Sequence, residues 1–189
     1  MVLFFYVNIL QTNNMFTDIS RFSRISDYLP ILNGAILADV LIIAALFYSP
    51  LFKSGQLEKW YTKYGLSAVI ADVLILVIGI IIARALYSCI FGEKFNIIAF
   101  VLLVVGIQVV HDVLFYFLFK SVPVGKNKML DLFKDYAKEV KGGAILGDSI
   151  MIAIAALLAS LLAGVSLNAN IITLIVATYV LPYVLHTKN

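Results

Sequence analysis

The sequence predicts an all-α integral membrane protein: a bundle of about five transmembrane helices, with four as the alternative, plus one interfacial amphipathic helix. Of the 189 residues, 62% are hydrophobic and 13% are charged, and the mean hydropathy is +1.02. Soluble domains contain roughly 45–50% apolar and about 25% charged residues. The apolar residues also form runs long enough to cross a hydrocarbon core of about 30 Å, which takes about 20 helical residues. A β-barrel would instead show short alternating segments.

Five apolar runs define the expected spans. They cover residues 33–52, 65–91, 96–119, 142–164 and 169–186. Prolines bracket the first run, and Pro182 falls near the end of the fifth, where a membrane helix tolerates it. These runs predict one transmembrane domain over residues 31–186, after a partly disordered or interfacial extension over 1–30. The opening residues lack the basic region and cleavage site of a signal peptide, so Met1 and Met15 are both candidate starts.

Lysine-rich loops set the expected orientation. Cytoplasmic loops of membrane proteins carry an excess of Lys and Arg. The loops 53–64 and 120–141 are both rich in lysine. We therefore expect both loops in the cytoplasm and the N-terminus on the opposite side of the membrane.

The second of these loops contains an amphipathic segment. Over residues 126–141, apolar side chains from Met129 to Val140 recur at helical spacing and lysines occupy the other faces. We expect this helix at the membrane interface, where its lysines would favour anionic lipid. The candidate lipid contacts are Lys126, Lys128, Lys134 and Lys138. A solvated helix that only fixes the topology is the alternative.

A weak internal repeat places acidic residues inside the spans. The segments "GAILADVLII", "SAVIADVLIL" and "GAILGDSIMI" align Asp39, Asp72 and Asp148, and "IQVVHDVLFY" places Asp112 in the same frame. A charge at the centre of a membrane helix costs about 2.5–3.5 kcal/mol on insertion scales, so these acids need an explanation. At 1.5 Å rise per residue, Asp72, Asp112 and Asp148 each lie about 10 Å inside the cytoplasmic ends of their spans. We expect them to meet at one level.

Two interpretations of these acids remain open. In the first, Asp72, Asp112 and Asp148 form a proton or cation site. Gln108 lies three residues before His111 and four before Asp112, a spacing that places all three on one face of a helix. We therefore include Gln108 and His111 in the same site. In the second, each acid hydrogen-bonds to a neighbouring helix and organises the packing.

The remaining embedded charges fall on the other side of the membrane by the same count. Asp39 and Arg84 are each about 10 Å deep there, and we expect them to form an intramembrane ion pair. Small residues near the acids predict close helix packing, because they let backbones approach. These are Gly79 and Ala83, which align with Asp72, and the GxxxG pair Gly143 and Gly147 beside Asp148.

Catalytic and cofactor motifs do not support an enzyme, which is the least expected function. Cys89 is the only cysteine, which excludes an intrachain disulfide and a cysteine-built metal site. The chain has no P-loop, no Rossmann glycine pattern, and no HExxH or GxSxG motif. We expect no cofactor, no metal and no nucleic-acid partner, since the lysines follow the topology rule.

The string "IQVVHDVLFYFLF", followed by "SVPVGKNKMLDLFKDYAKEVKGGAILGDSIM", resembles a group of uncharacterised multi-spanning membrane proteins of nucleocytoplasmic large DNA viruses of algae and protists. The resemblance covers roughly residues 27–186. It implies a virion inner membrane or a host membrane as the location. It implies no activity and no site residues.

Together these observations favour a viral membrane component whose aspartates organise helix packing and a polar cavity. A small proton or cation channel or transporter is the alternative function. A homo-oligomer is compatible with either, because a chain of this size often needs neighbours to enclose a pore. The structural question that separates the two is whether Asp72, Asp112 and Asp148 converge.

Overall fold

The computed structural model describes residues 15–49 and 54–187, which form helices and connecting turns without a β-strand. Five long helices dominate: α2 (Tyr28–Tyr48), α4 (Leu66–Phe91), α5 (Ile97–Ser121), α7 (Gly143–Leu162) and α8 (Leu167–Leu185). Two shorter helices, α3 (Gly55–Tyr64) and α6 (Lys128–Val140), lie between them, and a 3-10 turn, η2 (Ile25–Asp27), precedes α2. The all-α prediction is confirmed.

The five long helices are long and apolar enough to cross a membrane. Their positions follow the five apolar runs, and α6 follows the expected amphipathic segment. The chain is therefore a multi-pass membrane protein built as a helical bundle. The largest difference is at the first span, which begins at Tyr28 and not at residue 33. Pro30 lies in the first turn of α2, where a missing N–H leaves no helical hydrogen bond unmade.

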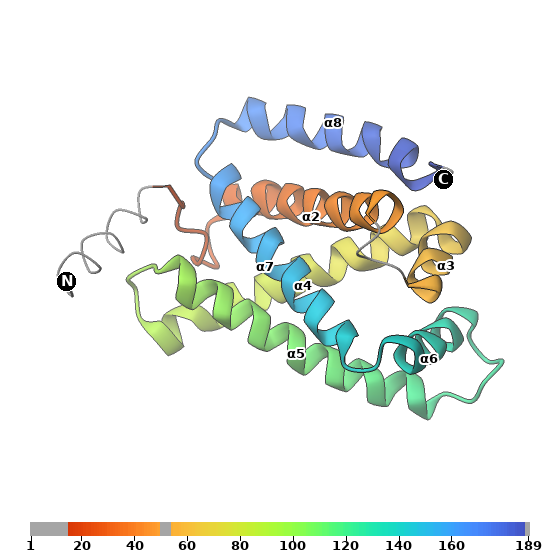
Figure 1. Cartoon of the computed structure of the whole chain (residues 1–189). Coiled ribbons are helices and arrows are strands. Elements are labelled where there is room, and N and C mark those ends of the chain that lie inside the picture. Colours follow the sequence, from red (N-terminus) through yellow and green to blue (C-terminus); the bar gives the residue numbers. More distant parts are fainter. Residues whose placement is uncertain (1–14, 50–53, 188–189) are drawn as a thin grey trace, which may run out of the picture.

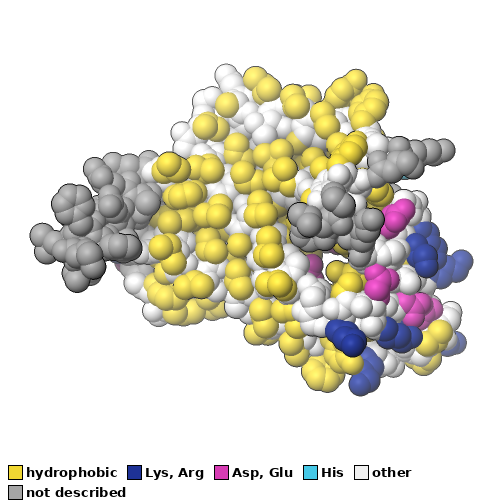
Figure 2. All heavy atoms as spheres, in the orientation of Figure 1, with side chains coloured by type: hydrophobic (Ala, Val, Ile, Leu, Met, Phe, Trp, Pro, Cys, Tyr) yellow, Lys and Arg dark blue, Asp and Glu magenta, His cyan; other side chains and the backbone are white. Residues whose placement is uncertain are grey.

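The two short helices lie side by side at one end of the bundle (Figure 1). We call this the α3/α6 end. The opposite end is made by residues 15–27, the loop 92–96 and the turn 163–166. In the view of Figure 2 the charged side chains gather around α3 and α6, while hydrophobic side chains cover most of the rest. This distribution fits an apolar band in lipid with one charged border.

Local signals in the sequence set the helix limits. The side chain of Asn96 accepts hydrogen bonds from the first amides of α5, and Asn127 does the same for α6. Gly65 has a φ of +53°, a left-handed value that glycine adopts without strain. This turn folds α3 back against the beginning of α4, which brings the buried face of α3 onto the spans.

The bundle closes where α2 crosses α7. A Cβ on Gly34 would lie 2.6 Å from the carbonyl oxygen of Ala155 and 2.7 Å from the amide nitrogen of Ala159, so only glycine fits there. Gly79 of α4 similarly faces Ile152 of α7, with a Cβ position 2.8 Å from its Cδ1 atom. Small residues therefore permit close helix approach at both crossings.

Of the four expected packing residues, Gly79 is in such a contact. Ala83 is fully buried and lies one turn beyond Gly79 on α4. The prediction for the Gly143 and Gly147 pair is wrong: a Cβ on Gly147 meets nothing within 4 Å, and one on Gly143 only touches Val140 at 3.9 Å. The physical reason is that the face of α7 buried against α2 carries Ala155 and Ala159, further along the helix.

The described part of the expected N-terminal extension is packed on the bundle. Ile19 is fully buried, and the amide of Thr17 donates to the carbonyl of Ser160 at 3.2 Å. The Ser160 hydroxyl donates back to the carbonyl of Thr17 at 2.6 Å. Residues 1–14, including the alternative start at Met1, lie outside the described residues.

Candidate functional site

The buried face of α3 holds two aspartates from two different spans. Trp60 and Tyr61 are 2% and 1% exposed. The Trp60 Nε1 donates to Oδ2 of Asp72 on α4 at 2.8 Å, and the Tyr61 hydroxyl donates to Oδ1 of Asp39 on α2 at 3.0 Å. A short interfacial helix therefore joins two acids that the sequence places in separate spans.

Tyr61 lies between these two acids. Burial, followed by the charges of Asp72 and Asp39, raises the pKa of Tyr61 well above its usual value of 10. The phenol therefore stays protonated at physiological pH and can donate a hydrogen bond at all times. Asp39 and Asp72 are within electrostatic reach of one another.

Asp148 of α7 and Asp112 of α5 complete the group. The carboxylate of Asp148 lies within electrostatic reach of both Asp112 and Asp72. Tyr136 of α6 faces the same region: burial, then the charges of Asp148, Asp72, Glu139 and Asp112, raise the pKa of this phenol. We call Asp39, Asp72, Asp112 and Asp148 the aspartate cluster. It lies beneath α3 and α6, one acid from each of four spans.

The expected polar group around Asp112 is present on α5. Gln108 Nε2 donates to Oδ1 of Asp112 at 2.7 Å, and Nδ1 of His111 lies 3.1 Å from the same oxygen. The His111 ring also stacks on Phe115, with the centroids 5.7 Å apart. Gln108, His111 and Asp112 thus form one hydrogen-bonded group on α5, the helix that contributes Asp112 to the cluster.

The aspartate cluster has no Lys or Arg partner among the described residues. Within residues 15–49 and 54–187, no Lys or Arg forms a salt bridge with any of its four acids. Among the described residues, Oδ2 of Asp39 and Oδ2 of Asp112 are buried without a hydrogen-bond partner. Buried polar atoms usually have a partner, so both carboxylates are only partly satisfied by hydrogen bonds.

Metal binding is not supported by the geometry. Among the described residues, no three or more His, Cys, Asp or Glu side chains come close enough to hold a metal ion together. The acids are near enough to interact electrostatically but are spread over four helices.

The prediction of an ion pair between Asp39 and Arg84 is wrong. Arg84 instead pairs with Asp27 at 3.2 Å, and Asp39 is held by Tyr61 at the α3/α6 end. The reason is the early start of α2, which places Asp39 eleven residues along the helix and about 16 Å from its beginning. Asp39 therefore belongs with the other three aspartates.

Arg84 lies in a second polar site, at the opposite end of the bundle. Its Nη2 atom donates to the carbonyl oxygens of Arg21 and Arg24 at 2.5 and 2.8 Å. The guanidinium packs over the Tyr28 ring at 4.7 Å. Asp27, which also binds Arg24 at 2.8 Å, supplies the compensating charge. Segments outside the spans thus provide the partners of this embedded charge.

The lysines predicted to contact lipid differ in availability. Lys134 is not free, because its ammonium donates to the carbonyl of Val122 at 2.6 Å and to Asp131 at 3.2 Å. Lys138 is exposed and pairs with Asp135 at 3.0 Å. Lys126 and Lys128 are exposed. The prediction therefore fails for Lys134 and stays a prediction for the others.

Sequence reasoning missed the donors of the site. Trp60 and Tyr61 fall in a segment treated as a topological loop, although "LEKWYTKYG" alternates aromatic and lysine residues at helical spacing. Tyr136 lies on the apolar face of the amphipathic segment, where the pattern indicates packing and not hydrogen bonding. The signal that could have found all three is their hydrogen-bonding capacity, because a buried Trp or Tyr usually reaches a polar partner.

Comparisons with models of known families, with curated proteins and with solved structures found no match.

Proposed function

We propose that this multi-pass membrane protein binds and transfers protons at the aspartate cluster, as a small proton channel or proton-coupled transporter. One observation carries the proposal: four carboxylates from four spans gather beneath α3 and α6 without a Lys or Arg partner among the described residues. Acids used only to fix packing would need one donor each and no mutual proximity.

Protons are the ligand that the cluster suits. Carboxylates that interact electrostatically in apolar surroundings favour a shared proton over full ionisation of every acid. The buried and partnerless oxygens of Asp39 and Asp112 are positions where a proton would sit. A carboxylic acid also removes most of the cost of placing a charge inside a membrane.

Two side chains beside the aspartate cluster, Tyr61 and His111, can transfer protons. The Tyr61 hydroxyl donates to Asp39, and it can accept a proton from a protonated Asp72 as it gives its own proton to Asp39. His111 lies against Asp112, and an imidazole can take up a proton on one nitrogen and release one from the other. Both steps leave the number of protons unchanged.

Proton flux in liposomes tests the proposal. The purified chain is reconstituted with a pH-sensitive dye inside, and a potassium diffusion potential drives proton entry. We expect flux for the wild type and a loss of at least tenfold for Asp148→Asn and Asp112→Asn, which keep the side-chain shape but cannot ionise. Glu93→Gln is the matched control, because Glu93 is an exposed acid at the opposite end. Absent wild-type flux, or equal flux in all variants, would refute the proposal.

A structural role is the second candidate, favoured by the hydrogen bonds from Trp60 and Tyr61. These bonds tie α3 to α2 and α4, as expected if the acids organise the bundle. In this role the protein would be a membrane component, and the resemblance to proteins of large DNA viruses suggests a virion or host membrane.

Asparagine and leucine variants separate the two roles. Asp72→Asn retains an acceptor for Trp60, whereas Asp72→Leu removes it. If transport is the function, Asp72→Asn should fold normally and lose flux. If packing is the only function, Asp72→Asn should match the wild type in both proton flux and the yield of folded protein. Asp72→Leu should reduce the yield of folded protein in detergent.

A further inference from the structure

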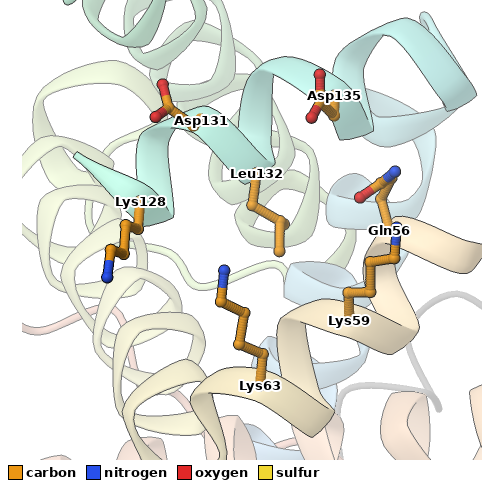
Figure 3. Close-up of a pocket in the computed structure, with 7 residues that line it drawn as sticks. All are labelled: Gln56, Lys59, Lys63, Lys128, Asp131, Leu132 and Asp135. Carbon is orange, nitrogen blue, oxygen red and sulfur yellow. The ribbon is translucent and has the colours of Figure 1, made fainter. Parts of the chain in front are cut away.

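A pocket of about 300 Å³ lies between α3 and α6 (Figure 3). Its lining residues come from both helices: Gln56, Lys59, Lys63, Lys128, Asp131, Leu132 and Asp135. In Figure 3, Lys128 and Leu132 extend from α6 towards α3, and Lys63 extends from α3 towards Leu132. Three ammonium groups thus border one pocket.

The acids of this pocket are already occupied. Asp131 accepts from the amide of Gly125 at 2.8 Å and pairs with Lys134 at 3.2 Å. These two interactions, the amide first, hold the pKa of Asp131 below its usual value, so the carboxylate is ionised and engaged. Asp135 pairs with Lys138 at 3.0 Å. In Figure 3 both acids lie on the upper side of α6, away from α3.

The three lysines have no such partners. Within the described residues, Lys59, Lys63 and Lys128 form no salt bridge with a carboxylate. Lys63 only lies near the Tyr64 ring, at 5.2 Å from its centroid. Ammonium groups on flexible stems are common ligands of phosphate groups. A pocket with three free ammonium groups therefore has the charge to bind a phosphate-bearing anion.

The position of the pocket fits the same ligand. It opens at the α3/α6 end, where the apolar band gives way to charged side chains (Figure 2). Amphipathic helices at such a border lie at the level of lipid headgroups. We propose that the pocket between α3 and α6 binds a phosphate-bearing anion through Lys59, Lys63 and Lys128. The phosphate is carried by an anionic lipid headgroup or by a soluble phosphate ester.

A bound anion would add a bridge between two helices that already meet through the Trp60 and Phe133 rings, 4.7 Å apart, and through the Gln56 amide, which donates to Glu139 at 3.1 Å. Lys59 and Lys63 belong to α3, and Lys128 begins α6. On their inner faces the same two helices carry Trp60, Tyr61 and Tyr136, which cover the aspartate cluster. An anion bound in the pocket would therefore hold α3 and α6 together above the aspartate cluster. The binding proposal itself does not depend on proton transfer.

The test is ligand-dependent thermal stabilisation of the full chain. One arm uses detergent micelles with inositol hexakisphosphate, and the other uses phosphatidylcholine nanodiscs with or without phosphatidylinositol phosphate. A ligand that binds only the folded state raises the unfolding temperature. We expect a rise in at least one arm for the wild type. Each lysine removed should weaken binding by about fivefold, from roughly 1 kcal/mol per lysine.

Matched variants keep the result interpretable. Lys59→Gln with Lys63→Gln retains two long side chains and should abolish the stabilisation while leaving the unliganded unfolding temperature unchanged. Lys94→Gln, an exposed lysine in the loop at the opposite end, should bind like the wild type. A rise only in nanodiscs identifies a lipid, and a rise only in micelles identifies a soluble ester. No rise in either arm, or equal rises in all variants, would overturn the proposal.

Discussion

The two ends of the bundle treat their embedded charges in opposite ways. At the end formed by residues 15–27, away from α3 and α6, Arg84 is 1% exposed and is matched by Asp27 and by two backbone carbonyls. At the α3/α6 end, Asp39, Asp72 and Asp112 accept hydrogen bonds, and none of the four aspartates forms a salt bridge with a Lys or Arg of the described residues. A matched charge is what a stable scaffold requires. An unmatched group of acids must hold protons or release them, which is why we assign function to the α3/α6 end.

The partners of the embedded charges come from outside the long helices at both ends of the bundle. Asp39 and Arg84 both lie well inside long apolar helices, yet each finds its partner in a segment outside those helices. For Arg84 the segment is 15–27, and for Asp39 it is α3. The role of an embedded charge in this protein is therefore set by the short segments at the membrane borders.

Removing the matched cation should cause the largest loss of stability. Arg84→Met leaves the carbonyls of Arg21 and Arg24 without a donor and weakens the pairing of Asp27. We expect a loss of about 3 kcal/mol or more in the free energy of unfolding, as for other buried pairs from which one member is removed. Unfolding in mixed detergent micelles measures this value.

Arg21→Met is the control for that prediction. The Arg21 side chain is 65% exposed and pairs with Asp18 at 3.2 Å, so its loss should cost at most about 1 kcal/mol. If both substitutions cost the same, the opposite end would not be the stabilised end, and the contrast between the ends would fail.

Removing one donor at the α3/α6 end should have an intermediate effect. Tyr61→Phe deletes the hydroxyl that binds Asp39 and leaves a fully buried carboxylate without a partner. The expected cost is about 1–3 kcal/mol. The neighbouring Tyr64 offers a matched control, because its hydroxyl is buried without a partner. Tyr64→Phe should be neutral or slightly stabilising, and a larger cost for Tyr64→Phe than for Tyr61→Phe would contradict the assigned contacts.

The smallest effect concerns the exposed rim of α6. The amide of Gly125, followed by Lys134, lowers the pKa of Asp131. Since the folded state has the lower pKa, the stabilisation is present above the ordinary carboxyl range and is lost as the pH falls through the lowered value. The amide proton shift of Gly125, followed by NMR in micelles, should therefore titrate below the usual pKa of 3.8. Asp131→Asn should remove the titration, and a midpoint at or above 3.8 would disprove the contact.

The spans were predictable because length and hydropathy alone decide them in a chain of this composition. The meeting of Asp72 and Asp148 was predictable from depth, since both lie near the beginnings of spans that run in the same direction. The position of Asp39 was not, because a proline and Asn33 near the start of α2 gave a false helix boundary. Helix α3 was missed because ten residues with three charges resemble a loop in sequence.

The close contact between Gly34 of α2 and the backbone of α7 could not be predicted from the sequence pattern either. Gly34 follows Asn33, and nothing in the sequence indicates that the backbone of α7 passes over it. Asn33 also donates to the carbonyl oxygen of Asn170 on α8 at 2.9 Å. Such contacts depend on which helices become neighbours, and that choice is made by the whole bundle.

The crossing of α2 with α7 has a consequence for biosynthesis. Hydrogen bonds that fix the first span join residues 137 positions apart, from Asn33 to Asn170, and the preceding segment is joined to Ser160 across 143 positions. Helix α2 therefore enters the membrane long before its main partner has been translated. Insertion of α7 and α8, which lie in the last quarter of the chain, is therefore the step that completes the bundle.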